Sequence, residues 1–151
     1  MKIRVSLALT FALAGCQDSA PPVPVVTPRE VAVVTPPKTG KLTVIDMTGL
    51  FPRQQAGGVL LYDVRPGFVT GFGKIPGAVS WPRGDFDRRL SLSETEIRAA
   101  RAAGKPVVIY CTDADCPDSR AVAEKLAARG HDVSILEGGY ADWKEAGLPT
   151  E

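Results

Sequence analysis

The sequence contains few of the side chains on which metal sites and many active sites depend: one histidine and three cysteines among 151 residues. Zinc centres usually need three or four thiolate, imidazole or carboxylate ligands, so this composition argues against a zinc centre. Positive and negative charges nearly balance, with a formal net charge of +1. This balance indicates neither a nucleic-acid partner nor an acidic one. The apolar run at residues 5–14 has roughly ten residues, too few to span a bilayer as a helix.

The amino terminus has the features of an export signal. Lys2 and Arg4 precede the apolar run, and the sequence Leu-Ala-Gly-Cys then ends at Cys16. This sequence resembles the lipobox of bacterial lipoproteins, in which the cysteine is lipidated and becomes the new amino terminus. The resemblance implies a protein anchored in the cell envelope and facing the periplasm. Gln17, in place of the aspartate associated with the inner membrane, favours the outer membrane. A plain secretory signal with a chance cysteine is the alternative.

These features divide the chain into a signal peptide at 1–15, a tether at 16–40 and a globular domain at 41–151. Proline removes N–H donors and favours extended polyproline conformation, so we expect a semi-rigid tether that lifts the domain off the membrane. An edge strand at 31–35 is the alternative for part of this segment. The tether holds Pro21, Pro22, Pro24, Pro28, Pro36 and Pro37.

The domain alternates short apolar runs with helical patterns, which predicts an α/β fold with a mostly parallel sheet. The run Val59–Arg65 is apolar almost throughout, as in a strand covered on both faces. Ser93 and Glu96 have the spacing of a capping box and predict a helix start at Ser93. Residues 66–74 are expected to form a glycine-rich loop, and residues 81–92 an irregular or briefly helical segment. The expected strands are 42–45, 59–65, 78–80, 107–110 and 133–136, and the expected helices 46–51, 93–103, 119–129 and 140–145.

Cys111 directly follows the buried strand predicted at 107–110, and a polar loop then leads to Pro117 and a helix. Ligands of parallel α/β sheets bind at the carboxyl ends of strands, where loop amides and helix amino termini meet. The positive end of a helix lowers the pKa of a nearby thiol. Cys111 is therefore the candidate nucleophile. His131 lies in a Gly-His-Asp turn, and we expect an ordinary surface role for it.

Three blocks of the domain, taken in order, resemble the rhodanese-like family. The first holds Leu61–Arg65 and, at the family's spacing, Gly73–Ala78. The second is Val108–Cys111 with its loop. The third is Leu136–Trp143, closed by Ala146–Pro149. Together these blocks extend over nearly the whole domain, and the ordered set is far more specific than any one block.

The resemblance implies one domain with a five-stranded, mostly parallel sheet and helices on both faces. It also implies that Cys111 carries a persulfide sulfur from a small donor, thiosulfate or a persulfide, to a thiol acceptor. No cofactor, metal or nucleic acid is implied, and we expect a monomer. Backbone amides of the loop after Cys111 would stabilise the anionic sulfur. The loop residues are Thr112, Asp113, Ala114, Asp115, Cys116 and Pro117.

The sequence departs from the family's pattern in two places. Lys74 stands where the family has a histidine, at a position that is usually structural. The loop between Cys111 and Ser119 is about two residues longer than in common members, which predicts a wider pocket. It contains Asp113, Asp115 and Asp118 and no basic residue, and such carboxylates would raise the pKa of the thiol and repel thiosulfate.

The sequence leaves the roles of Cys116 and of the Asp63–Arg65 pair open, and it does not fit a phosphatase. Cys116 could resolve the persulfide of Cys111, form a regulatory or resting disulfide with it, or be a small residue of the loop. Asp63 and Arg65 follow a strand and could be an acid–base pair or a structural ion pair; the family favours the ion pair. A phosphatase would need an arginine about six positions after the cysteine, where this chain has Pro117.

Overall fold

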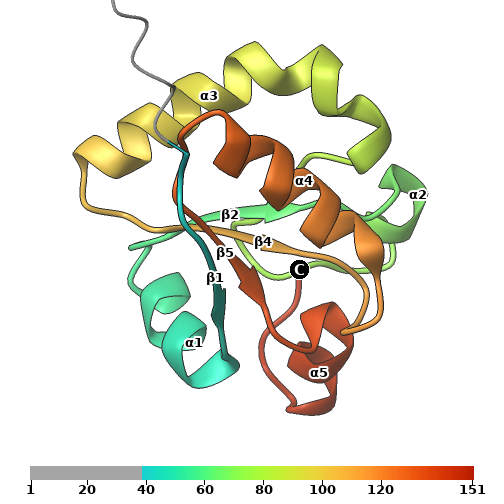
Figure 1. Cartoon of the computed structure of the whole chain (residues 1–151). Helices are drawn as coiled ribbons and strands as arrows, with labels where there is room; N and C mark the ends of the chain where they lie inside the picture. Colours follow the sequence, from blue (N-terminus) through green and yellow to red (C-terminus); the bar gives the residue numbers. More distant parts are fainter. Residues whose placement is uncertain (1–38) are drawn as a thin grey trace, which may run out of the picture. The chain divides into compact units, whose positions relative to one another are not determined.

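The computed structural model describes residues 39–151 (Figure 1). The predicted signal peptide, almost all of the predicted tether, the alternative strand at 31–35 and the lipidation site Cys16 lie outside the described residues. Those assignments stay predictions. In the part of the chain that the structure describes, no helix is both long and apolar enough to cross a membrane.

Five parallel strands form the sheet, in the order β1-β5-β4-β2-β3. The central strand β4 has four fully buried residues, as expected for a strand covered on both faces. This sheet, with helices on both faces, confirms the predicted fold class. The strands are β1 (Leu42–Ile45), β2 (Leu60–Asp63), β3 (Val79–Ser80), β4 (Val107–Tyr110) and β5 (Val133–Leu136).

Side chains alternate along each strand, so the two faces of the sheet have separate cores. On one face, Tyr62 and Ile109 pack with residues of α3 (Phe86–Ala102) and α4 (Pro117–Ala128). On the other, Leu61 and Val108 pack with residues of α1 (Met47–Gln55) and α5 (Gly139–Glu145). The connections after β2 and β3 contain two short helices, α2 (Gly67–Thr70) and the 3₁₀-helix η1 (Arg83–Asp85).

The prediction that a helix starts at Ser93 is wrong. Helix α3 begins at Phe86, and Ser93 lies inside it with a fully buried side chain. Phe86 stacks on Trp81, with ring centroids 5.1 Å apart, so burial of this pair draws the segment into the helix. The capping-box spacing is thus overridden by tertiary packing.

Other details of the elements also differ from the prediction. Helix α1 continues through Pro52 to Gln55. Helix α4 begins at Pro117 rather than Ser119, because proline is well suited to the first helical position, where no N–H partner is needed. The loop predicted at 66–74 contains the single turn of α2.

The expected surface role of His131 is also wrong. Its side chain is buried, with Nε2 3.5 Å from a carboxylate oxygen of Glu94. The chain at Gly40 packs so closely on the His131 backbone that a Cβ at residue 40 would overlap it. His131 lies shortly before β5, at the amino ends of the strands, whereas Cys111 follows the carboxyl end of β4.

Candidate functional site

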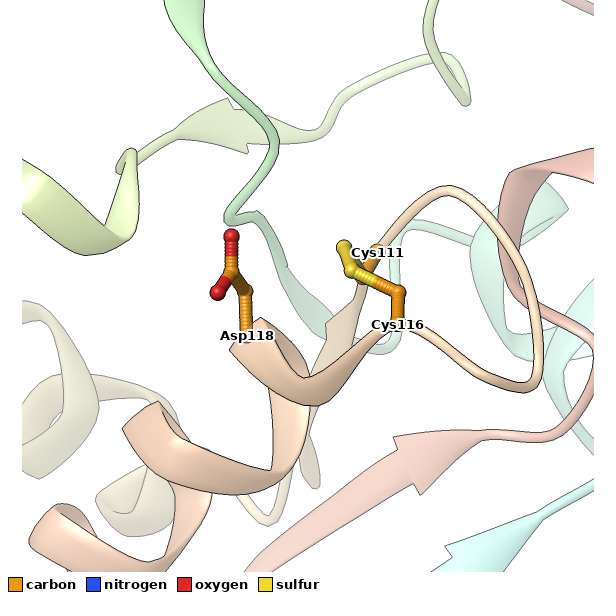
Figure 2. Close-up of side chains that lie close together, drawn as sticks. All are labelled: Cys111, Cys116 and Asp118. Atoms are coloured by element: carbon orange, nitrogen blue, oxygen red, sulfur yellow. A yellow bond between two sulfur atoms is a disulfide. The ribbon is translucent and has the colours of Figure 1, made fainter.

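Cys111 lies directly after β4 and is almost completely buried, with 2% of its surface exposed. Its sulfur forms a disulfide with Cys116, the residue before α4, and the two Cα atoms are 6.1 Å apart (Figure 2). The chain therefore leaves β4, makes a loop over four residues and returns to its starting point. Of the three interpretations of Cys116, this geometry fits a thiol that reacts with Cys111.

The loop after Cys111 is attached to the start of α5. The N–H groups of Tyr140 and Ala141 donate to the carbonyls of Cys111 and Thr112, at 2.9 and 2.8 Å. Gly139 has φ +63°, and a Cβ there would lie 2.7 Å from the Cys111 carbonyl oxygen. Glycine at this position thus lets the backbone of α5 approach the thiol's own peptide group.

Inside the loop, some of the backbone donors are already occupied. The N–H of Asp115 donates to the Asp113 carboxylate at 3.1 Å, and the N–H of Cys116 donates to the Asp113 carbonyl at 3.4 Å. Pro117 has no N–H, so it cannot contribute to the predicted amide cradle. Within this loop of the described domain, the N–H groups of Thr112, Asp113 and Ala114 have no protein acceptor. Thr112, Asp113, Ala114 and Asp115 are all exposed.

Arg83 is a residue of the site that the sequence analysis missed. It belongs to η1, and its guanidinium lies 2.8 Å from the carboxylate of Asp118 in the first turn of α4. The cation offsets one of the three loop carboxylates that were expected to repel an anionic donor. Both residues border a cavity of about 350 Å³, which Val64 and Pro66 also line. The sequence gives no signal for this contact, because 35 positions separate the two residues.

Asp63 and Arg65 form a buried ion pair at the carboxyl end of β2. Both Asp63 oxygens accept hydrogen bonds from Arg65, at 3.0 Å from Nε and 2.6 Å from an Nη, and both side chains are essentially fully buried. The same Nη donates to the carbonyl of Gly73 at 2.8 Å. The guanidinium carbon lies 4.0 Å from the ring centroid of Tyr140 and 5.5 Å from that of Tyr110. Arg65 thereby joins β2, the loop after it, β4 and α5.

Tyr110 extends this network toward Cys111, its neighbour in the chain. Its hydroxyl donates to Asp63 at 2.7 Å and accepts from the N–H of Ile75 at 3.1 Å. Burial and the negative charge of Asp63 raise the pKa of Tyr110. Burial lowers the pKa of Arg65, but the hydrogen bonds and charge of Asp63 outweigh it, so that the net shift is upward. Asp63 and Arg65 thus hold the strand ends on which the thiol is placed.

The arrangement of the domain matches a known family. A sequence profile described as Rhodanese-like domain matches residues 52–146, which is more than half of the chain and includes Cys111 and both blocks around it. The chain belongs to the rhodanese-like domain family.

Two rhodanese-like structures have the same fold. The rhodanese-related protein from Thermoplasma volcanium superposes with a TM-score of 0.60 at 23% identity, over 72% of this chain and 97% of that one. A thiosulfate sulfurtransferase from Pseudomonas aeruginosa superposes with a TM-score of 0.52 at 25% identity, over 78% of this chain and 20% of that one. The fold is therefore shared with single-domain and larger proteins.

A relative by sequence is the HTH-type transcriptional regulator Rv0324 of Mycobacterium tuberculosis. It is 34% identical over 105 residues, which are 68% of this chain and 42% of that protein. The chain spans less than half the length of this relative.

In this rhodanese-like domain, Lys74 has a structural role in place of the family's histidine. Its ammonium donates to the carbonyl of Ala78 at 2.9 Å and pairs with Glu151 at 2.6 Å. The backbones of Lys74 and Glu151 also exchange two hydrogen bonds, so the carboxyl terminus is fixed beside this loop.

Asp118 also adds a third potential ligand near the two cysteines. The ligand atoms of Cys111, Cys116 and Asp118 lie within 4.8 Å of one another. The small number of histidines and cysteines in the sequence argued against zinc, but it could not show that this carboxylate lies beside the two cysteines. In the disulfide form the sulfurs are not thiolates, so these residues could hold a soft metal only after reduction.

Proposed function

We propose that the protein is a sulfurtransferase that moves a sulfane sulfur through a persulfide on Cys111. The single observation that carries this proposal is the position of Cys111 in a rhodanese-like domain. The thiol follows the central strand and lies beside the amino terminus of α4, where N–H groups of the loop and the helix dipole favour an anionic sulfur. These features provide a thiolate without a histidine base.

In the first half-reaction, the Cys111 thiolate attacks the sulfane sulfur of thiosulfate. A sulfur–sulfur bond forms on the enzyme, the donor's sulfur–sulfur bond breaks, and sulfite leaves with the electron pair. In the second, an acceptor thiolate attacks the outer sulfur, takes it as a persulfide and releases the Cys111 thiolate. A persulfide donor enters by the same attack and leaves as a thiolate. The free N–H groups of Thr112 and Ala114 support a cradle for the anionic outer sulfur.

Cys116 offers a second way to remove the sulfur from the Cys111 persulfide. Its thiolate attacks the inner sulfur of the Cys111 persulfide, a Cys111–Cys116 disulfide forms, and sulfide leaves. A reducing thiol must then break the disulfide, becoming oxidised itself, before Cys111 accepts another sulfur. The disulfide also favours a second candidate function, in which the domain is a redox-active thiol module or a docking surface that does not transfer sulfur.

The proposed location is the cell envelope. The lipobox-like sequence ending at Cys16 supports a lipid-anchored protein facing the periplasm, with Gln17 favouring the outer membrane. A net charge near zero supports a small sulfur donor and a thiol acceptor rather than nucleic acid as partners, although one relative is a transcriptional regulator. We propose a monomer that needs no cofactor.

Intact-mass spectrometry of the reduced protein after treatment with thiosulfate tests the proposal. We expect a gain of one sulfur atom on the wild type, none on Cys111→Ser, and a longer-lived adduct on Cys116→Ser, which cannot resolve it. Cys16→Ser in every variant removes the third thiol as a matched background. A wild-type protein that gains no sulfur while its two thiols cycle between reduced and oxidised forms would support the redox module instead.

A further inference from the structure

The described part of the chain has a second hollow, far from Cys111 in the sheet. It has a volume of about 600 Å³ and lies where β1, β5 and β4 begin, between α1 and the turn before β4. Four cationic side chains line it, and all four residues are exposed: Lys41, Arg53, Arg101 and Lys105. They come from three separate segments of the sequence, since Arg101 and Lys105 lie at the end of α3 and in the turn after it; the fold brings these segments together.

The lining also offers polar groups between the cations. The hydroxyls of Thr43 and Ser134 lie 2.8 Å apart on adjacent strands. The one carboxylate is that of Asp132, which accepts from the N–H of Lys41 at 2.8 Å and from Arg101 at 3.3 Å. The formal charge of the lining is therefore +4 − 1 = +3. Cations and hydroxyls around one hollow suit an anion with several oxygen atoms, such as a phosphate ester.

The hollow is also the place where the chain enters the domain. The N–H of Gly40 donates to the carbonyl of Ala127, and the carbonyl of Lys41 accepts from Val133, which fixes this entry point beside the hollow. Val107 lines the hollow and begins β4, whereas Cys111 directly follows the other end of β4. Because the strands are parallel, the entry of the chain before β1 and the reactive cysteine after β4 lie at opposite ends of the same sheet.

We propose that this hollow binds the phosphate head groups of anionic phospholipids in the membrane that holds the protein, an inference that rests on the proposed lipid anchor at Cys16. Only 24 residues, 17–40, separate Cys16 from Lys41, so an anchored domain stays within roughly 85 Å of the surface even on a fully extended tether. This confinement raises the effective concentration of head groups around the hollow. The exposed Asp113 and Asp115 lie at the opposite end of the sheet and are repelled by the same surface, so Cys111 faces the periplasm.

Binding to vesicles tests this proposal. The protein is residues 16–151 with Cys16→Ser, the expected processed chain without acyl groups, and the vesicles contain phosphatidylcholine with or without phosphatidylglycerol. We expect binding only to the anionic vesicles. The double variant Arg53→Ala/Lys105→Ala should bind roughly thirtyfold more weakly, because each basic side chain near an anionic surface contributes. The matched control is Arg120→Ala/Lys144→Ala, which removes the same charge from exposed positions in α4 and α5 and should bind as the parent does.

Three results would overturn the proposal. The first is that the protein does not bind vesicles with phosphatidylglycerol. The second is that both double variants lose the same affinity for these vesicles. The third is that free inorganic phosphate binds in the hollow while vesicles do not bind. Equal loss would mean a non-specific attraction of the whole domain. Sulfur loading of Cys111 is measured without vesicles, so failure of vesicle binding and failure of the proposed sulfur transfer are distinguished.

Discussion

The N–H of Tyr140 donates a 2.9 Å hydrogen bond to the carbonyl of Cys111, so helix α5 holds the peptide group of the reactive cysteine itself. The contact depends on Gly139, the residue before Tyr140, whose missing side chain lets two backbones meet. The third block of the family resemblance, Leu136–Trp143, thus acts on the site through backbone contact. Its side chains need not touch the sulfur.

Gly139→Ala should damage both stability and sulfur transfer. Its φ of +63° disfavours alanine, and the new Cβ would lie 2.7 Å from the Cys111 carbonyl oxygen. We expect a loss of about 2–3 kcal/mol in the free energy of unfolding and at least roughly tenfold slower sulfur loading. Urea denaturation and timed mass spectrometry measure the two effects. Gly67→Ala is the control, because no atom lies within 4 Å of its Cβ position; equal effects in both variants would contradict the close approach.

The fold could be predicted from the sequence because its signals are local. The continuous apolar run at 107–110 and the mainly apolar run at 133–136 are strands in the structure, and the position of Cys111 follows from the first of them. Ser93 shows where such local reasoning fails. Its capping-box spacing is real, but the stacking of Phe86 on Trp81 extends the helix past it.

The detailed site could not be predicted, because its contacts join residues that are distant in the sequence. Arg83 reaches Asp118 across 35 positions, and Arg65 reaches Tyr140 across the sheet. Neither contact leaves a pattern in one sequence. The spacing of Cys111 and Cys116 allowed a disulfide but did not require one, since the path of the loop decides the Cα separation.

Asp63→Asn should destabilise the domain by about 3–5 kcal/mol, because it leaves the buried guanidinium of Arg65 without its counter-charge. Urea denaturation at neutral pH measures the loss. The control is Arg88→Ala, which breaks an ion pair with Asp85 in which the arginine side chain is 78% exposed; it should change stability by at most about 0.5 kcal/mol. If the two variants lose similar free energies of unfolding, the buried pair contributes no more to stability than an exposed pair does.

Reduction of the Cys111–Cys116 disulfide should lower the free energy of unfolding by about 2 kcal/mol, the contribution expected when a cross-link closes a six-residue loop. Denaturation with and without reductant, in a Cys16→Ser background, measures this difference. Cys116→Ala should give the same value under both conditions. If the reductant leaves the free energy of unfolding of the wild type unchanged, the two sulfurs are not bonded in solution.

Alkaline pH should destabilise the domain through Tyr62 and Tyr110. The pKa of Tyr62 is raised, first by burial and then by Glu96, which accepts a 2.7 Å hydrogen bond from the Tyr62 hydroxyl. Burial also raises the pKa of Tyr110. Below about pH 10 both tyrosines are protonated in the folded and unfolded states. Above it the unfolded chain loses protons that the folded domain keeps, so stability falls as pH rises, by about 1.4 kcal/mol per pH unit for each tyrosine.

Tyr62→Phe tests this dependence, because it removes one of the two protons and should reduce the slope of unfolding free energy against pH by about half a proton at about pH 10 and by nearly one proton at about pH 11. Urea denaturation at several values between about pH 9.5 and 11 measures the slope for both proteins. The variant also loses the hydrogen bond to Glu96, but that loss shifts the whole curve and leaves its slope unchanged. An unchanged slope in Tyr62→Phe would mean that the Tyr62 hydroxyl ionises as easily in the folded domain as in the unfolded chain, contrary to its burial against α3.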